Sequence, residues 1–233
     1  MKHYLMVDLG TGNSRVALVD SDGGILGLRT YTNVYHRDSA YEDGQYFLPE
    51  DWAALLLQGC RELCREHPDV QVNAVSAAGA RQSFVLLDGN GRAFLGLPNI
   101  DNRGRAYMAQ VPEHDEIYRL SGKWATEDFG AAKLLGLRMQ HPEQYEAVES
   151  VLSLSEWIAW IFTGRKVMEY TQACESQLYD IGQRSWSQTL CSFYGLRPEF
   201  LPPLQAAGTA VGPILDTYRR ELGMAKDAVF VLG

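Results

Sequence analysis

The amino-acid sequence predicts an α/β protein built on a mixed β-sheet, flanked by helices and carrying helical insertions in its second half. Short apolar runs at the start are separated by turns rich in Asp and Gly, a pattern typical of antiparallel strands. From residue 49 onward, apolar positions recur at helical spacing and alternate with further short strands. This order favours a mixed sheet over a barrel or a helical bundle.

Three antiparallel strands are expected at the start of the chain. Residues 4–9 are an apolar run that ends at a carboxylate and glycines, and residues 15–19 and 25–31 form two more runs. The turn at residues 20–24 separates the last two, and its Asp and Gly residues tolerate the positive φ of a hairpin. The chain therefore does not begin as a β-α-β unit.

A helix and three further strands are expected next. Pro49 and the acidic residues after it suit a helix start, and the apolar residues that follow have helical spacing. Residues 72–78 have the composition of a buried strand. Residues 84–87 and 93–97 are apolar runs on either side of an Asp-Gly-Asn-Gly turn.

The last hundred residues are predicted to be mainly helical. Helical spacing occurs in four segments, at residues 128–140, 155–164, 185–196 and 212–222. Gly164 is placed to end the second of these helices as a C-cap. An apolar, β-branched strand then follows at residues 227–233, and no linker or repeat interrupts the chain.

The composition predicts a globular protein without nucleic-acid or membrane partners. Hydrophobic residues make up 46% of the 233 residues, which permits a large core. The net charge of −8, without a long Lys/Arg run, argues against a nucleic-acid or anionic membrane surface. With no leader and no apolar run near the ~20 residues of a membrane helix, a cytoplasmic location is expected. The four cysteines are expected to be buried or half-buried thiols rather than metal ligands.

The segment Met-Val-Asp-Leu-Gly-Thr-Gly-Asn-Ser-Arg, residues 6–15, has the composition of a phosphate-binding turn. It is not a Walker loop, because no Gly-Lys-Ser/Thr follows. It is not a dinucleotide fingerprint either, since Arg15 replaces a required glycine or alanine and a strand follows instead of a helix. What remains is a tight β-turn whose backbone N–H groups and short polar side chains suit an anion.

We expect this anion to be phosphate, bound by the polar and glycine residues of the turn: Gly10, Thr11, Gly12, Asn13, Ser14 and Arg15. A carboxylate beside a phosphate is repulsive unless a cation lies between them, so Asp8 predicts Mg²⁺, bound through water. The alternative is an ordinary glycine-rich hairpin with an incidental polar tip.

The pattern Asp-x-Gly-Thr-x-x-x-Arg in this segment resembles the first phosphate motif of actin, heat-shock ATPases and sugar kinases. Within that group the chain resembles the FGGY carbohydrate kinases over essentially its whole length. Four further segments match the family in its order, at residues 76–92, 99–105, 128–138 and 155–165. The resemblance implies a ribonuclease-H-like fold, ATP and Mg²⁺ as cofactors, and a sugar or polyol as substrate.

The resemblance places substrate contacts in two segments. Arg81 and Gln82 lie on the turn that contacts the substrate, where a guanidinium and an amide suit hydroxyl-rich ligands. The alternative is a surface pair with no ligand. Asp101 and Arg103 match the family's Asp-x-Arg segment, in which the carboxylate either accepts a bond from a sugar hydroxyl or forms an ion pair.

Several residues depart from the family pattern and weaken the transfer of any named substrate. Asp128 stands where glycerol kinases have a substrate-stacking Tyr, and Glu156 replaces an Asp. Gln172 and Glu175 stand where many members have Asp and a small residue. Of the five tryptophans, Trp124 is the best candidate for a sugar-stacking platform, and the others are expected in the core.

The resemblance also implies parts that lie outside the chain. The family's catalytic base is an Asp on a Gly-Gly-x-Asp turn, so it is expected just beyond Gly233, with no catalytic residue inside the chain. The adenosine pocket belongs to the family's C-terminal domain. Residues 1–233 are therefore expected to be the N-terminal, sugar-binding domain of a larger kinase, inactive alone, with its own C-terminal domain and a homodimer as expected partners.

Two alternatives remain open from the sequence. Arg81 and the pattern Asn99-x-Asp101 resemble autoinducer-2 kinases more than xylulokinases, which favours an autoinducer-2-type substrate. A non-catalytic sugar-binding protein that kept the fold and lost the chemistry is the second alternative.

Overall fold

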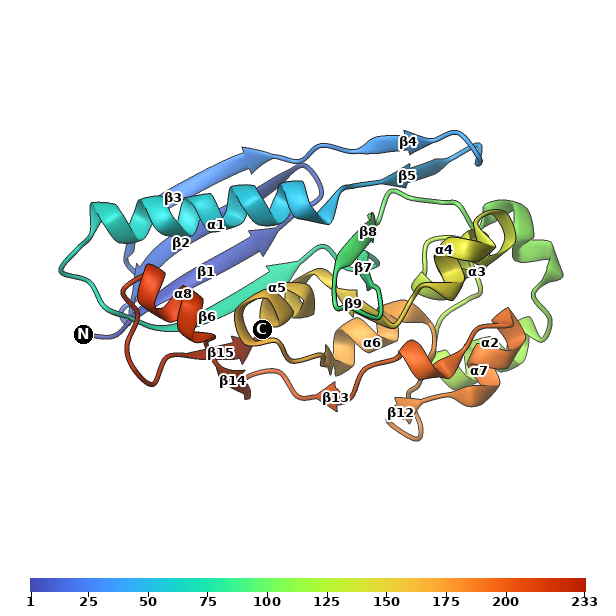
Figure 1. The fold of residues 1–233 in the computed structure, drawn as a ribbon. Coiled ribbons are helices and arrows are strands. Elements are labelled where there is room, and N and C mark those ends of the chain that lie inside the picture. Colours follow the sequence, from blue (N-terminus) through green and yellow to red (C-terminus); the bar gives the residue numbers. More distant parts are fainter.

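A computed structural model describes residues 1–233 and contains a central six-stranded mixed sheet (Figure 1). The strand order across the sheet is β14-β15-β6-β1-β2-β3. The bounds are β1 His3–Leu9, β2 Asn13–Asp20, β3 Ile25–Thr32, β6 Val72–Gly79, β14 Ala210–Pro213 and β15 Val229–Leu232. Strands β1, β2 and β3 pair antiparallel, whereas β6 runs parallel to both β1 and β15. The predicted mixed sheet with three antiparallel opening strands is confirmed.

Helices cover one face of this sheet because buried and exposed side chains alternate along its strands. In β1, Leu5, Val7 and Leu9 are buried, whereas Met6 between them is 41% exposed. The buried face packs against α1 (Pro49–Glu66) and α5 (Leu154–Thr163) in a core cluster of 30 residues. The short helix α8 (Asp216–Glu221) lies in the connection between β14 and β15.

The second group of elements surrounds a three-stranded sheet in the order β8-β7-β9. Its strands are β7 Phe84–Leu87, β8 Ala93–Leu97 and β9 Ser150–Ser153. Its helices are α2 His114–Ser121, α3 Gly130–Gln140, α4 Pro142–Glu146, α6 Tyr170–Ser176 and α7 Gln188–Tyr194, with 3₁₀ turns η1 Arg105–Gln110 and η2 Pro198–Phe200. They bury a separate cluster of 23 residues. In Figure 1 the arrowheads of β1 and β6 point toward this group.

Six very short strands complete the fold as three two-stranded pairs. They are β4 His36–Asp38 with β5 Gly44–Tyr46, β10 Met168–Glu169 with β13 Leu204–Gln205, and β11 Tyr179–Asp180 with β12 Ser185–Trp186. The β4–β5 hairpin extends over the second group of elements, as Figure 1 shows.

Two predicted helices are shorter than the sequence pattern indicates. Residues 210–213 are the edge strand β14, so the helix expected at residues 212–222 begins only at Asp216. Pairing with β15 overrides the helical spacing there, and Pro213 is tolerated because it ends an edge strand. Likewise, Ser185 and Trp186 pair with β11, and Ser187 caps a helix that starts at Gln188.

The predictions about the cysteines and Gly164 agree with the structure, whereas those about the tryptophans agree in part, because Trp160 and Trp186 are only partly buried. All four cysteines are free thiols, two of them buried and two half-buried. Trp52 and Trp157 are core residues, whereas Trp124 is 58% exposed. Gly164 ends α5 in the left-handed conformation, with φ of +68°. No helix in the structure combines the length and apolarity that crossing a membrane requires.

Candidate functional site

Three parallel strands end at one edge of the main sheet and bring the predicted site segments together. Strands β1, β6 and β15 run in the same direction, so their carboxyl ends lie side by side. The N–H of Ala80, just after β6, donates to the carbonyl of Leu9 at the end of β1, at 2.7 Å. Ligand crevices of open α/β sheets form at such carboxyl ends. The β1–β2 loop (residues 10–15, including the first three residues of β2) and the Arg81–Gln82 turn (residues 80–83) are therefore neighbours.

The backbone of the β1–β2 loop is held from behind through its carbonyl groups. The Asn33 amide donates to the carbonyls of Gly10 and Thr11, at 2.7 and 3.3 Å. The hydroxyl of Tyr35 donates to the same Thr11 carbonyl, and the Asn33 N–H donates to the carbonyl of Gly12. No hydrogen bond within the chain uses the N–H groups of Thr11 or Gly12. The loop thus presents free donors, which is the arrangement an anion requires.

The polar side chains of this loop divide into two kinds. Ser14 is 3% exposed and donates its hydroxyl to Asn33 Oδ1 at 2.7 Å, so it supports the loop from inside. Arg15 and Asp8 form an ion pair of 2.8 Å in which both side chains are about half exposed. Asn33 and Tyr35 were missed by sequence reasoning, because they follow directly after β3 and belong to no motif.

The Arg81–Gln82 turn carries two polar side chains that form no hydrogen bond within the chain. Gln82 has a φ of +62°, a left-handed conformation that is uncommon for a residue with a side chain. Such strained positions are concentrated at functional sites. Directly before the turn, Gly79 packs against α5, where an added Cβ would lie 2.6 Å from the Cβ of Leu154. The close packing of β6 on α5 fixes where the turn projects.

Residues 98–103, by contrast, form a buried segment whose charges are paired internally. Asp101 and Arg103 are 0% and 1% exposed, and Arg103 Nε lies 2.7 Å from Asp101 Oδ2. The N–H of Gln45 in β5 donates to Asp101 Oδ1, and Arg103 Nη2 donates to the Gln45 carbonyl. Burial raises the pKa of Asp101, and the cations nearby oppose this effect. The structure therefore contains the ion pair that was one of the two alternatives for Asp101.

Lys133 in α3 holds the same segment by its main chain. Its fully buried ammonium donates to the carbonyls of Pro98, Asn99 and Asp101, the first at 3.0 Å. Burial lowers the pKa of Lys133 to about 8. Gly104, just beyond the segment, has no room for a Cβ, which would lie 2.1 Å from the carbonyl oxygen of Ala132. Helix α3 thus fixes the path of the buried segment from one side.

A buried carboxyl group lies in the first turn of α5. Glu156 is 0% exposed and accepts hydrogen bonds from the hydroxyls of Ser153 and Ser155 and from the N–H of Glu169. Burial raises the pKa of Glu156 to about 7. Glu169 in turn caps α6 by accepting from the N–H groups at its start. Glu156, which stands where the family has Asp, thus links α5 to the start of α6 by accepting from the Glu169 N–H.

Trp124 and Asp128 lie on the loop before α3. Trp124 stacks on Tyr118, with ring centroids 4.4 Å apart, and remains mostly exposed. Lys123, beside it, forms a 2.9 Å ion pair with Glu175 in α6. Asp128 is exposed and accepts a hydrogen bond from the Thr126 hydroxyl. Residue 128 therefore offers no aromatic ring on which a substrate could stack.

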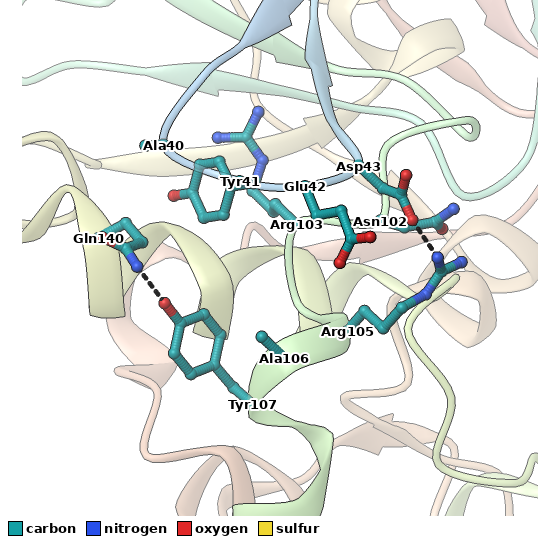
Figure 2. Close-up of a pocket in the computed structure, with 10 residues that line it drawn as sticks. All are labelled: Ala40, Tyr41, Glu42, Asp43, Asn102, Arg103, Arg105, Ala106, Tyr107 and Gln140. Atoms are coloured by element: carbon teal, nitrogen blue, oxygen red, sulfur yellow. Dashed lines mark hydrogen bonds and ion pairs between the residues drawn. The ribbon is translucent and has the colours of Figure 1, made fainter.

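A cavity of about 150 Å³ lies beside the buried segment, and no residue of the β1–β2 loop or the Arg81–Gln82 turn lines it (Figure 2). It is lined by the tip of the β4–β5 hairpin, residues 102–107 and Gln140 at the end of α3. Arg105, its most exposed cation, is paired with Asp43 and Glu127, and Gln140 donates to Tyr107. Of the predicted site residues only Arg103 lines this cavity, and none of the predicted phosphate ligands does, so the cavity is distinct from the candidate site at the strand ends.

Comparison with known proteins identifies the fold and the family. Residues 3–233 match the FGGY family of carbohydrate kinases, N-terminal domain. The chain belongs to this family. The solved xylulose kinase of Lactobacillus acidophilus has the same fold, with a TM-score of 0.89 at 20% identity over 100% of this chain and 48% of that one. The ribonuclease-H-like architecture implied by the sequence resemblance is therefore correct.

Two relatives bear on the closer relationship. The chain is 40% identical to YoaC, a candidate sugar kinase of Bacillus subtilis (strain 168), over 100% of this chain and 48% of YoaC. It is 29% identical to the autoinducer-2 kinase of Salmonella choleraesuis (strain SC-B67), over 99% of this chain and 45% of that kinase. The chain thus spans about half the length of the relatives it matches.

Proposed function

We propose that this chain is the acceptor-binding, N-terminal half of an ATP-dependent carbohydrate kinase that phosphorylates a hydroxyl of a ketose or polyol. The observation that carries the proposal is the meeting of a donor-rich loop and an unengaged Arg-Gln turn at the carboxyl ends of β1 and β6, in a chain of the FGGY family. A phosphate and a hydroxyl-rich molecule bound there would lie next to each other, as phosphoryl transfer requires.

The β1–β2 loop would bind the terminal phosphates of ATP. The free N–H groups of Thr11 and Gly12 supply neutral donors, and Arg15 supplies a positive charge. Asp8 fits a water-mediated Mg²⁺, because this ion keeps most of its waters and takes one or two carboxylates together with substrate phosphates. Its carboxylate is 53% exposed and shares one oxygen with Arg15, so the other oxygen is available. Bound Mg²⁺ would neutralise charge on the phosphates.

The acceptor would bind at the Arg81–Gln82 turn. Both side chains are free of internal hydrogen bonds, and both can donate to hydroxyl oxygens. The Asp101–Arg103 pair would shape the neighbouring segment, and direct contact of Asp101 with a sugar hydroxyl remains a prediction. A base for the hydroxyl proton, the remaining phosphate ligands and the adenosine pocket would come from the other half of a longer protein, acting in the cytoplasm.

An autoinducer-2-type acceptor is the second candidate. It is favoured by the similarity to autoinducer-2 kinases along 99% of the chain and by Arg81 together with Asn99-x-Asp101. Both candidates use the same site and the same transfer of the ATP γ-phosphate. They differ only in the carbon skeleton of the acceptor.

A screen of acceptors tests the proposal. The full-length protein is incubated with ATP, Mg²⁺ and ketoses, polyols or the autoinducer-2 precursor, and ADP release is followed with a coupled assay. We expect release with at least one acceptor and none from chain 1–233 alone. Binding of an acceptor without any ADP release would identify a non-catalytic sugar-binding protein and contradict the proposed kinase. Robust phosphorylation by chain 1–233 would contradict the division of the site between two halves.

Substitutions locate the acceptor within the site. R81A removes charge-assisted hydrogen bonds and is expected to raise the KM for the acceptor by about 10- to 100-fold. R92A is the matched control, because Arg92 is an exposed arginine on the β7–β8 turn, 70% exposed and away from the strand ends. Equal KM values for R81A and the unaltered protein would remove this turn from the site.

A further inference from the structure

Asn99 connects three parts of the candidate site that are distant in the sequence. Its side-chain amide donates to Thr11 Oγ1 in the β1–β2 loop at 2.9 Å. Its backbone N–H donates to the hydroxyl of Ser83, next to Gln82, at 2.9 Å. Its carbonyl receives a hydrogen bond from Lys133. One residue therefore joins the loop that presents the free N–H donors to the turn that carries Arg81 and Gln82.

In the orientation that donates to Thr11, the carbonyl oxygen of the Asn99 amide has no hydrogen-bond partner. Asn99 Oδ1 is enclosed by the protein and has no hydrogen-bond partner. Buried polar atoms without partners are destabilising and uncommon in native structures, so each requires a reason. An apolar residue of the same shape would avoid this penalty. The position is thus occupied by a residue that is unfavourable for stability and makes one specific contact.

The direction of that contact determines the role of the Thr11 hydroxyl. A hydroxyl has one proton and two lone pairs. Since the Asn99 amide donates to Thr11 Oγ1, one lone pair is used and the hydroxyl proton remains free, and no acceptor within the chain takes it. The free proton lies on the same loop as the unengaged N–H groups of Thr11 and Gly12. It can therefore serve as a further donor to an anion.

We propose that Asn99 is a positioning residue that couples the phosphate-binding loop to the acceptor-binding turn, by orienting the Thr11 hydroxyl toward the phosphate and holding Ser83 beside Gln82. This inference rests on the proposed function and adds to it a residue outside the predicted phosphate and substrate sets. The coupling makes binding of ATP and of the acceptor mutually favourable, because each ligand orders a turn that Asn99 ties to the other.

The test compares isosteric substitutions in the full-length protein, with ATP and the best acceptor from the screen. N99L removes both the donor and the unsatisfied oxygen. We expect the KM values for ATP and for the acceptor to rise about tenfold, the loss of one hydrogen bond, while the melting temperature stays equal or increases. A residue with a merely structural role would instead lower the melting temperature and leave both KM values unchanged. N90L, on the exposed β7–β8 turn, is the matched Asn→Leu control.

Thr11 gives a second, independent measurement from the other side of the bond. T11V is expected to raise the KM for ATP, T11S to recover most of that loss, and the double variant N99L/T11V to be no worse than the more impaired single variant. If N99L fails to fold, T11V and T11S decide the question. Unchanged KM values in N99L or T11V would overturn this inference and leave the proposed function intact. Absence of activity in the unaltered protein with every acceptor would overturn the proposed function, and this inference with it.

Discussion

Charged side chains at the β1–β2 loop and the Arg81–Gln82 turn are exposed, with Arg15 paired only to Asp8 and Arg81 without a partner, whereas those of the buried segment at residues 98–103 are enclosed and paired with each other. Both regions match family motifs in the sequence. The difference indicates that a family motif contains two kinds of residue, those available to bind a ligand and those that fix the path of the backbone. Exposure and free hydrogen-bonding capacity separate the two kinds, and the following predictions measure that separation through stability.

The largest loss of stability is expected when the buried ion pair is broken. R103M leaves the carboxylate of Asp101 buried without its partner, which costs about 3–5 kcal/mol of unfolding free energy. R105M is the matched control two residues further on, because Arg105 is 52% exposed and its ion pairs lie in solvent. It should cost less than about 1 kcal/mol. Urea denaturation of chain 1–233 measures both, and equal losses would refute the distinction between buried and exposed charges.

The second prediction concerns the pH dependence of stability near Glu156. Its pKa rises from 4.5 to about 7 on folding, because burial disfavours the charged form. Between these values the folded state holds a proton that the unfolded state has lost, so stability falls as pH increases from 4.5 to 7. The decrease should be roughly 3 kcal/mol. Thermal unfolding of chain 1–233 at pH 5 and pH 7.5 measures it.

E156Q tests whether this carboxyl group causes the effect. The amide cannot ionise, so the decrease in stability between pH 5 and pH 7.5 should become smaller. E146Q is the control, since the Glu146 side chain is 68% exposed and pairs only with Arg197 at the surface. A pH profile in E156Q identical to that of the unaltered chain would assign the dependence to another group.

Much of this fold follows from local sequence patterns, because the strands of the main sheet have clear apolar alternation and turns with Asp and Gly. The misjudged helix starts at residues 185 and 212 lie where short strands pair, β12 with the neighbouring β11 and β14 with β15, and helical spacing alone does not reveal such pairing. The sequence pattern picks out the β1–β2 loop, whose binding of phosphate stays a prediction. It does not pick out the supports Asn33 and Tyr35, because they act through carbonyl groups of the loop. Similarly, no sequence pattern shows that Asp101 and Arg103 are enclosed or that Asn99 reaches Thr11.

The smallest change in stability is expected at the exposed pair of Asp8 and Arg15. R15Q should alter the unfolding free energy by less than about 1 kcal/mol, since exposed ion pairs contribute little. The same substitution should raise the KM for ATP in the full-length protein by about 10- to 100-fold, because it removes a charge-assisted contact to phosphate. D8N should leave stability equally unaffected and increase the Mg²⁺ concentration required for half-maximal activity. Replacing Arg15 would then affect the KM for ATP and not the unfolding free energy, whereas replacing Arg103 affects mainly the unfolding free energy. If R15Q instead unfolded the chain or left the KM unchanged, the β1–β2 loop would be an ordinary hairpin.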